Sequence, residues 1–351
     1  MVRSLPLITA GLPGIGGQIK SKPSHFVVEE VPLYAPAGQG EHIYLRLTRE
    51  GWTTRAVQAR LAELFGLREV DVGCAGLKDK RARVTQTFSL WLPHESEARV
   101  AELVRDSLPF ELDWVKRHRN KIKAGHLVGN AFRILVVGTG RNATKQATKI
   151  AELLRERGVP NFYGAQRFGM DGDNATRGRA ILVGRKRVRD WTGRFLVAAY
   201  VSSLFNDWLA ERMRFGWFES LLTGDIAKKT DTGGLFEVED ASIEQPRFRR
   251  GEITYTGPIY GYKMRWATGE PGTLEREVLE DSGVTEAMLH RAGVRGSRRR
   301  ARLLIEDLTV NPDPLGLRFT FTLPKGAYAT IVLREFMKPD EEPPEVGQAK
   351  D

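Results

Sequence analysis

Short stretches of alternating hydrophobic and polar residues dominate the first 140 positions of the chain. Alternation with a period of two is typical of strands that have one buried face. We predict strands, the first with a proline-marked kink, at residues 18–30, 42–47, 84–90 and the second half of 125–137.

Two segments among these strands repeat their apolar residues at helical spacing instead. The first starts at Thr53 or Thr54, carries Val57 and Leu61 on one face and ends at Gly66. The second follows Asn142 and ends at Gly158. Thr and Asn are common helix caps, and glycine commonly follows the last turn. The first part of the chain is therefore expected to be α+β, with helices packed against strands.

The pattern changes after Pro160. Residues 191–214 and 275–290 have helical periodicity, and the Gly-bearing stretch 224–262 is expected to be irregular. Residues 317–323 alternate again as a strand, and residues 327–337 continue as a helix. We expect this last strand to return to the first sheet, which makes the middle of the chain an insertion. The acidic, Pro-bearing tail, 339–351, is expected to be disordered.

Length and charge narrow the class of protein. A chain of 351 residues exceeds the usual size of one core, so we expect two domains. The formal net charge is +10, which favours an acidic partner. Basic clusters lie at residues 116–123, 185–189 and 298–302. If they face one cleft, they form a track for a phosphate backbone; the alternative is three separate solvated faces.

Cysteine and histidine usage excludes several kinds of site. Cys74 is the only cysteine and the six histidines lack metal-ligand spacing, so the sequence predicts no disulfide framework and no metal site. Cys74 is interpreted as a small buried residue. No apolar run has the length of a membrane span, and the N-terminal region lacks a signal-peptide core. We expect a cytoplasmic protein that is a monomer without an evident protein partner.

Residues 73–82 form a charged loop with a single acid. Asp79 lies among Lys78, Lys80 and Arg81, between a helix-like and a strand-like segment. Nearby cations lower the pKa of a carboxyl and attract phosphate, so this loop suits chemistry on a polyanion. The alternative is that Asp79 is an ordinary turn or cap residue.

Aromatic residues interleave with the basic residues. Phe132, Phe162, Tyr163 and Phe168 all lie within a few positions of an arginine. Rings beside guanidinium groups suit stacking of unpaired RNA bases, although core packing is the alternative for each ring.

Several motifs in a fixed order resemble the TruD family of tRNA pseudouridine synthases over nearly the whole chain. The stretches that carry the resemblance are residues 20–29, 40–42, 75–80, 129–132, 160–169, 299–300 and 323–335.

The resemblance implies an α+β fold in which a pseudouridine-synthase catalytic domain with a mixed, mainly antiparallel sheet comprises residues 1–157 and 305–338. An inserted α/β TRUD domain would comprise residues 158–304. The implied activity is isomerisation of uridine 13 of tRNA, with tRNA as the partner and no cofactor or metal.

The resemblance also implies roles for individual residues. Asp79 matches the catalytic aspartate of the family, and Asn130 and Phe132 match its Asn-x-Phe motif. Lys20 aligns with a basic residue near the catalytic acid. The other residues expected to bind the substrate are Lys80, Arg81, Phe162, Arg167 and Arg299.

The chemical route stays open at this point. Asp79 could attack C1′, attack C6 or remove a proton from C2′, and all three routes need the ionised carboxylate. A dry site walled by Leu77 and Phe132 would keep water from the sugar intermediate. The rival functions are a non-catalytic RNA-binding protein and a nucleic-acid hydrolase or lyase.

Overall fold

The chain folds into two compact units in a computed structural model that describes residues 5–169, 171–184 and 190–338. Unit 1 comprises Met1–Gly14, Glu152–Ile305 and Ala327–Asp351, and unit 2 comprises Ile15–Ala151 and Glu306–Gly326. The boundary at residue 151 falls within helix α3 (Ala143–Arg157). The domain boundaries that the family resemblance implies, at residues 157 and 305, stay a prediction.

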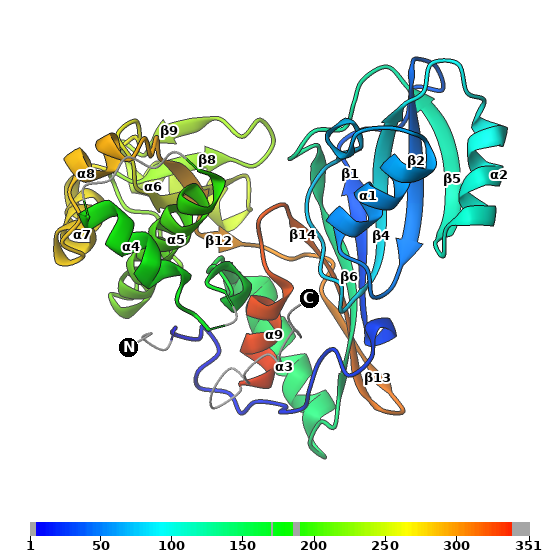
Figure 1. Cartoon of the computed structure of the whole chain (residues 1–351). Coiled ribbons are helices and arrows are strands. Elements are labelled where there is room, and N and C mark those ends of the chain that lie inside the picture. Colours follow the sequence, from blue (N-terminus) through cyan, green and yellow to red (C-terminus); the bar gives the residue numbers. More distant parts are fainter. Residues whose placement is uncertain (1–4, 170, 185–189, 339–351) are drawn as a thin grey trace. The chain divides into compact units, whose positions relative to one another are not determined.

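An eight-stranded sheet forms the centre of unit 2, with strand order β13-β14-β6-β1-β4-β2-β5 and with β3 paired to β4 (Figure 1). Only β1 and β4 run parallel, and the other pairs are antiparallel. This confirms the predicted α+β fold with a mixed, mainly antiparallel sheet. The strands are β1 (Phe26–Pro32), β2 (His42–Arg49), β3 (Gly73–Cys74), β4 (Arg83–Trp91), β5 (Glu111–His118), β6 (Leu127–Val137), β13 (Thr309–Asp313) and β14 (Gly316–Pro324).

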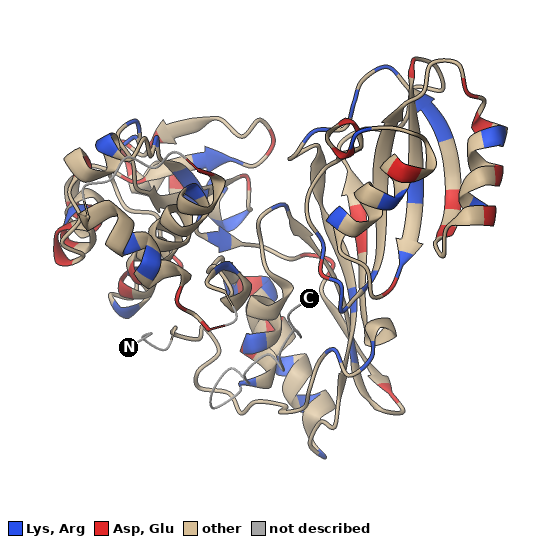
Figure 2. Ribbon diagram, viewed as in Figure 1, with Lys and Arg blue, Asp and Glu red and all other residues tan. Residues whose placement is uncertain are grey.

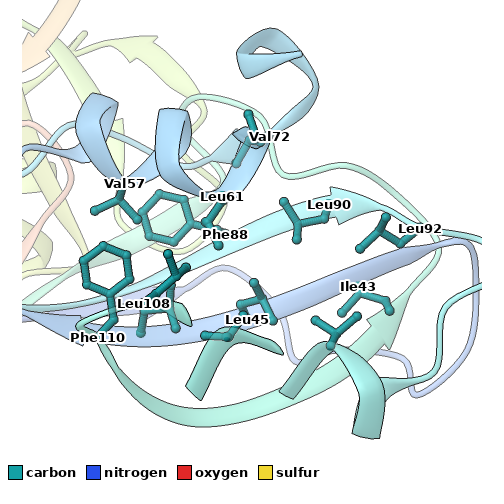
Figure 3. Packing of buried hydrophobic residues seen from close by; sticks show 14 residues of the cluster. Ile43, Leu45, Val57, Leu61, Val72, Phe88, Leu90, Leu92, Leu108 and Phe110 are labelled. Carbon is teal, nitrogen blue, oxygen red and sulfur yellow. The ribbon is translucent and has the colours of Figure 1, made fainter. Parts of the chain in front are cut away.

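Two helices, α1 (Thr54–Leu64) and α2 (Glu97–Ser107), contribute to the main core of unit 2. Thr53 caps α1 as predicted, because its side chain accepts a hydrogen bond from the Ala56 amide. Figure 3 shows Val57 and Leu61 of α1 packed against Phe88 of β4. Burial of such side chains contributes about 25 cal/mol per Å² of apolar surface. The helix α2 and strand β5 were not predicted from the sequence.

The N-terminal segment of unit 2 differs from the expected long strand. Strand β1 begins only at Phe26, after the short 3-10 helix η1 (Pro23–His25). Upstream of it, Gln18 exchanges backbone hydrogen bonds with Val137 at the end of β6. The residues before β1 are thus attached to the sheet at Gln18, and Ile15 is also buried.

The strand β14 joins the C-terminal part of the chain to the first sheet. It pairs with β6 from Gly316 opposite Val137 to Pro324 opposite Gly129. The alternation at residues 317–323 therefore predicted both the strand and its return to the sheet correctly.

Unit 1 surrounds the long helix α5 (Trp191–Arg214), which has the bounds that the sequence predicted. Its buried Arg212 forms an ion pair of 2.7 Å with Asp225. A four-stranded sheet has the order β11-β10-β8-β9, and a two-stranded sheet pairs β12 with β7. The other elements are β7 (Val159–Pro160), η3 (Ala165–Arg167), α4 (Asn174–Val183), β8 (Ile226–Lys229), β9 (Leu235–Glu237), α6 (Ala241–Arg249), β10 (Ile253–Ile259), α7 (Gly269–Asp281), α8 (Glu286–Arg291), β11 (Ser297–Arg300), β12 (Arg302–Leu303) and α9 (Ala329–Met337).

Two sequence expectations for unit 1 were wrong. The stretch 224–262 is not irregular but contains β8, β9, α6 and β10. The expected helix at 275–290 is two helices, because α7 ends at Asp281 and Thr285 caps a new helix, α8. The basic cluster 185–189 and the tail 339–351 lie outside the described residues. In the part of the chain that the structure describes, no helix is long and apolar enough to cross a membrane.

Candidate active site

The loop that carries Asp79 is attached to the rest of unit 2 by hydrogen bonds to its backbone. The Gln86 side chain on β4 donates to the Gly76 carbonyl at 2.7 Å, and the Lys78 amide donates to the Thr54 hydroxyl at 2.9 Å. The Gly51 amide donates to the Lys80 carbonyl at 3.0 Å. These contacts fix the loop backbone on both sides of Asp79. Such anchoring positions the carboxylate.

The Asp79 carboxylate forms an ion pair with Lys20. The distance from Lys20 Nζ to Asp79 Oδ2 is 2.6 Å, and the two side chains are 12% and 23% exposed. The Arg81 amide donates to Asp79 Oδ1 at 2.9 Å. Burial alone would raise the pKa of Asp79, but the bonds from Lys20 and from the Arg81 amide outweigh it and lower that pKa. The carboxylate is therefore ionised at neutral pH.

The backbone of Lys20 has an uncommon conformation. Its φ angle is +59°, which lies in the left-handed region that costs a non-glycine residue roughly 1–2 kcal/mol. The same residue places its ammonium 4.9 Å from the centre of the Phe26 ring. Strained residues of this kind are concentrated at functional sites. The local strain at Lys20 accompanies its contact with Asp79.

Lys78 points away from its neighbour Asp79. Its ammonium donates to Asn130 Oδ1 at 2.6 Å and forms an ion pair of 3.0 Å with Glu30. The sequence predicted Lys78 as a cation around Asp79, and this was wrong for its side chain. Its contacts instead connect the loop to Asn130, the first residue of the Asn-x-Phe motif.

Phe132 lies two residues after Asn130 on β6, so the two side chains share one face of the sheet. Its ring packs edge-on against Phe26, with 6.2 Å between ring centres, and tilted by 32° against Phe321, with 5.5 Å between ring centres. Phe26 in turn contacts Lys20, so aromatic packing connects Phe132 to the cation of the site. Leu77, the other expected wall, is 67% exposed in this structure.

A second group of predicted residues lies in unit 1. Arg299 donates to the Asn161 side chain at 2.7 Å, and its guanidinium lies 4.0 Å from the centre of the Tyr163 ring. Arg167 lies 5.7 Å from the centre of the same ring and donates to Ser202 at 3.0 Å. Burial lowers the pKa of Arg299, and Arg167 acts in the same direction. A bound anion would stabilise both cations.

The neighbours of these arginines have structural roles. Phe162 is 1% exposed, so its ring offers no face to a base and belongs to the core of unit 1. Arg298 forms a buried ion pair of 2.7 Å with Glu275. Arg302 donates to the Glu156 carbonyl at 3.1 Å and lies 4.4 Å from the centre of the Phe248 ring. The predicted basic cluster 298–302 is therefore only partly available for phosphate, as Arg298 and Arg302 are committed to the fold.

Basic residues are spread over strands, helices and loops of each unit in Figure 2. Lys116, Arg119 and Lys123 of the first basic cluster are exposed, whereas Arg117 donates to the Gly40 carbonyl at 2.7 Å. The convergence of the three clusters on one track stays a prediction.

Sequence reasoning missed Glu30 and Tyr328. Glu30 lies two residues after the buried Val28 on β1, so the two side chains share one face, and this parity was the available signal for an inward-facing acid. Tyr328 lies 6.0 Å from Tyr163 between ring centres. Burial raises the pKa of Tyr328, and Arg167 and Arg299 oppose that rise. It lies in the stretch 323–335, but nothing in that stretch indicated a contact with residues 160–169.

Cys74 is half-buried against the core of unit 2 rather than fully buried, and burial raises the pKa of its thiol. Among the residues that the structure describes, no group of three His, Cys, Asp or Glu side chains is placed to hold a metal ion.

The fold is an α+β scaffold, and its candidate site contains the ionised Asp79. The family model of tRNA pseudouridine synthase D (TruD) matches residues 5–191 and 186–336. The chain therefore belongs to the TruD family of tRNA pseudouridine synthases, which are isomerases.

Relatives of similar length support this assignment. The tRNA pseudouridine synthase D of Anaeromyxobacter dehalogenans is 44% identical over 97% of this chain and 99% of its own. That of Thermus thermophilus is 43% identical over 95% of this chain and 92% of its own. The crystal structure of a tRNA pseudouridine synthase D (TruD) protein from Methanosarcina mazei has a TM-score of 0.78 and 23% identity, and the match covers 95% of this chain and 96% of that one. This structural likeness shows the fold.

Proposed function

We propose that this chain isomerises uridine 13 of tRNA to pseudouridine, with Asp79 as the catalytic nucleophile or base on a flipped-out uridine. The observation that carries the proposal is the ion pair of 2.6 Å between Lys20 and Asp79 on an anchored loop. It supplies a carboxylate that is ionised, positioned and still 23% exposed. The relatives named tRNA pseudouridine synthase D supply the substrate class.

The reaction is an isomerisation, so substrate and product have the same composition although one hydrogen exchanges with solvent. The bond from C1′ to N1 breaks, the uracil turns, and a bond from C1′ to C5 forms. The proton on C5 leaves to solvent, and N1 finishes with a proton. Attack by Asp79 on C1′ or C6, or abstraction of the C2′ proton, each starts from the ionised carboxylate that the structure contains.

Asn130 and Phe132 are suited to hold the base during its rotation. The base must leave its stack, which costs a few kcal/mol, and the protein must hold it in the site. The Asn130 amide is fixed by Lys78, so it can form a directed hydrogen bond to the base. Phe132 is mostly buried, and its packing against Phe26 and Phe321 supports an apolar floor.

Contacts to the phosphate backbone are assigned to residues of both units. In unit 2, Lys80 and Arg81 follow Asp79 directly and are partly exposed. In unit 1, Arg167 and Arg299 flank Tyr163, and their mutual repulsion favours a phosphate between them. Aromatic and guanidinium groups in such an arrangement are suited to unpaired nucleotides.

The position of the modified uridine is tested with two tRNA transcripts that differ only at position 13, which is uridine in one and cytidine in the other. Both carry uridine labelled with tritium at C5. We expect release of one equivalent of tritium from the uridine-13 transcript and none from the other. Equal release from both transcripts would show that another uridine is the target.

A further inference from the structure

A buried charged network lies directly beneath the loop that carries Asp79. Lys78 is 6% exposed and Glu30 is 2% exposed, and they form an ion pair of 3.0 Å. The Lys78 ammonium also donates to Asn130 Oδ1 at 2.6 Å. None of these contacts is to Asp79 itself, although Lys78 precedes it in the chain. This network is therefore separate from the ion pair between Lys20 and Asp79.

The register of the sheet explains why these groups meet. Glu30 on β1 is directly opposite Asn130 on β6 in the antiparallel pair, so both side chains leave the same face. The Glu30 carboxylate also accepts two hydrogen bonds from strand β4. The Gln86 side chain donates to Glu30 Oε2 at 3.2 Å, and the Thr87 amide donates to Oε1 at 3.4 Å. Glu30 is thus fixed by two strands before it contacts Lys78.

Hydrogen-bond chemistry fixes the orientation of the Asn130 amide. A lysine ammonium has donors only, so the atom that faces it must be the amide oxygen. The amide NH₂ group then points the other way and can only donate. A fixed donor on the active-site face suits an acceptor oxygen, such as a carbonyl oxygen of uracil.

We propose that Lys78 and Glu30 are positioning residues that lock Asn130 with its NH₂ group directed at a carbonyl oxygen of the reacting uracil. The inference rests on the proposed function, since it assigns a role within that reaction. The pair acts through Asn130 and does not touch the substrate.

The stability of the folded protein does not by itself explain why an ion pair is buried at this place. Burial of two charges carries a large desolvation cost, and apolar replacements of buried ion pairs are often neutral or stabilising. The neighbouring positions Val28, Val84 and Phe132 on the same face are buried and apolar. An apolar pair at positions 30 and 78 would avoid the cost of burying two charges but could not orient the Asn130 amide.

A double-mutant cycle tests the proposal. The paired variant Lys78→Met with Glu30→Gln removes both charges of the pair at once, so neither partner is left without the other. The buried Arg49, which also interacts with Glu30, keeps its charge in every variant. Single-turnover tritium release is measured at saturating tRNA for wild type, the paired variant, Asn130→Ala and the triple variant. We expect the paired variant to lose rate on the order of 10- to 100-fold, as misplaced groups do. In the Asn130→Ala background the same change should cost less than about 3-fold.

Equal losses in both backgrounds would overturn the proposal, because Lys78 and Glu30 would then act independently of Asn130. An inactive wild type would overturn the proposed function and this inference together, whereas an active wild type with additive losses overturns only the inference. If the paired variant does not fold, Glu30→Gln alone is compared in the two backgrounds with the same criterion.

The matched control removes a buried ion pair of unit 1, with Arg212→Met and Asp225→Asn. This pair has side chains that are 0% and 1% exposed. We expect the control to lower thermal stability while the single-turnover rate of the folded protein stays within about 2-fold. A rate loss equal to that of the Lys78 and Glu30 variant would assign both losses to general destabilisation and contradict the positioning role.

Discussion

The ionised state of Asp79 results from competition between burial and its cation. Burial raises the pKa of the carboxyl, whereas Lys20 and the Arg81 amide lower it, and the net direction is downward. A carboxyl with a lowered folded-state pKa stabilises the protein at pH values above its unfolded pKa. That contribution is lost as the pH falls through the folded-state pKa. The ion pair therefore serves both activity and stability near neutral pH.

Lys20→Met should shift the acidic limb of the pH–rate profile to higher pH. Without the ammonium, the effect of burial on Asp79 is no longer opposed by its main partner, so the pKa of the carboxyl rises. The measurement is single-turnover tritium release as a function of pH.

The control for this change is Lys80→Met, which removes a neighbouring cation in the same loop. An unchanged acidic limb in Lys20→Met, with a lower rate at every pH, would mean that Lys20 does not set the protonation state of the catalytic group.

At the residue scale, the sequence predicted the acid, and the family resemblance placed Lys20 near it. Asp79 among cations in a glycine-bearing loop was recognisable from residue types and from the family motif. The sequence did not show that Lys20, and not Lys78, pairs with Asp79. This choice depends on which lysine side chain is buried in the sheet. The Lys78 ammonium contacts Glu30 and Asn130, whereas Lys20, which is distant in the sequence, pairs with Asp79.

At the scale of elements, strand β11 combines a buried arginine with partly buried ones. Arg298 is buried with Glu275, whereas Arg299 is only partly buried and lies over the Tyr163 ring. Adjacent residues of a strand point to opposite faces, which explains the different roles of these two neighbours. The basic cluster in the sequence did not show this division.

Arg299→Ala should weaken tRNA binding and reduce its salt dependence. Loss of one phosphate contact lowers the slope of log K against log salt concentration by about 0.7 to 0.9. Binding is measured by filter retention or fluorescence anisotropy over a range of salt concentrations. Arg99→Ala on α2, where Arg99 pairs with Glu102 at 2.8 Å, is the control and should leave the slope unchanged. A normal slope for Arg299→Ala would exclude Arg299 from the phosphate contacts.

Element prediction succeeded where one periodicity was clear. The strands at β2, β4 and β14, the cap of α1 and both ends of α5 followed from alternation, capping and helical spacing. It failed in 224–262, because glycines at turns concealed short strands and a short helix. Element prediction also failed at β5, because the basic cluster 116–123, which overlaps this strand, was interpreted only by its charge.

At the scale of the whole molecule, family membership extends over most of the chain, and relatives of nearly equal length share it. The return of β14 to β6 unites distant parts of the sequence in the sheet that carries Asn130 and Phe132. The order of the family motifs indicates, through the resemblance, that these parts of the chain form one domain. The register that places Glu30 opposite Asn130 could be seen only in the structure.

The most direct test compares wild type with Asp79→Asn on tRNA that carries tritium at C5 of uridine, in the presence of a chelator. We predict tritium release by wild type with the RNA chain intact. We predict no release by Asp79→Asn, whose tRNA affinity should stay within a few-fold. Release by Asp79→Asn at the wild-type rate would contradict the catalytic role of Asp79, and strand cleavage by wild type would contradict isomerisation.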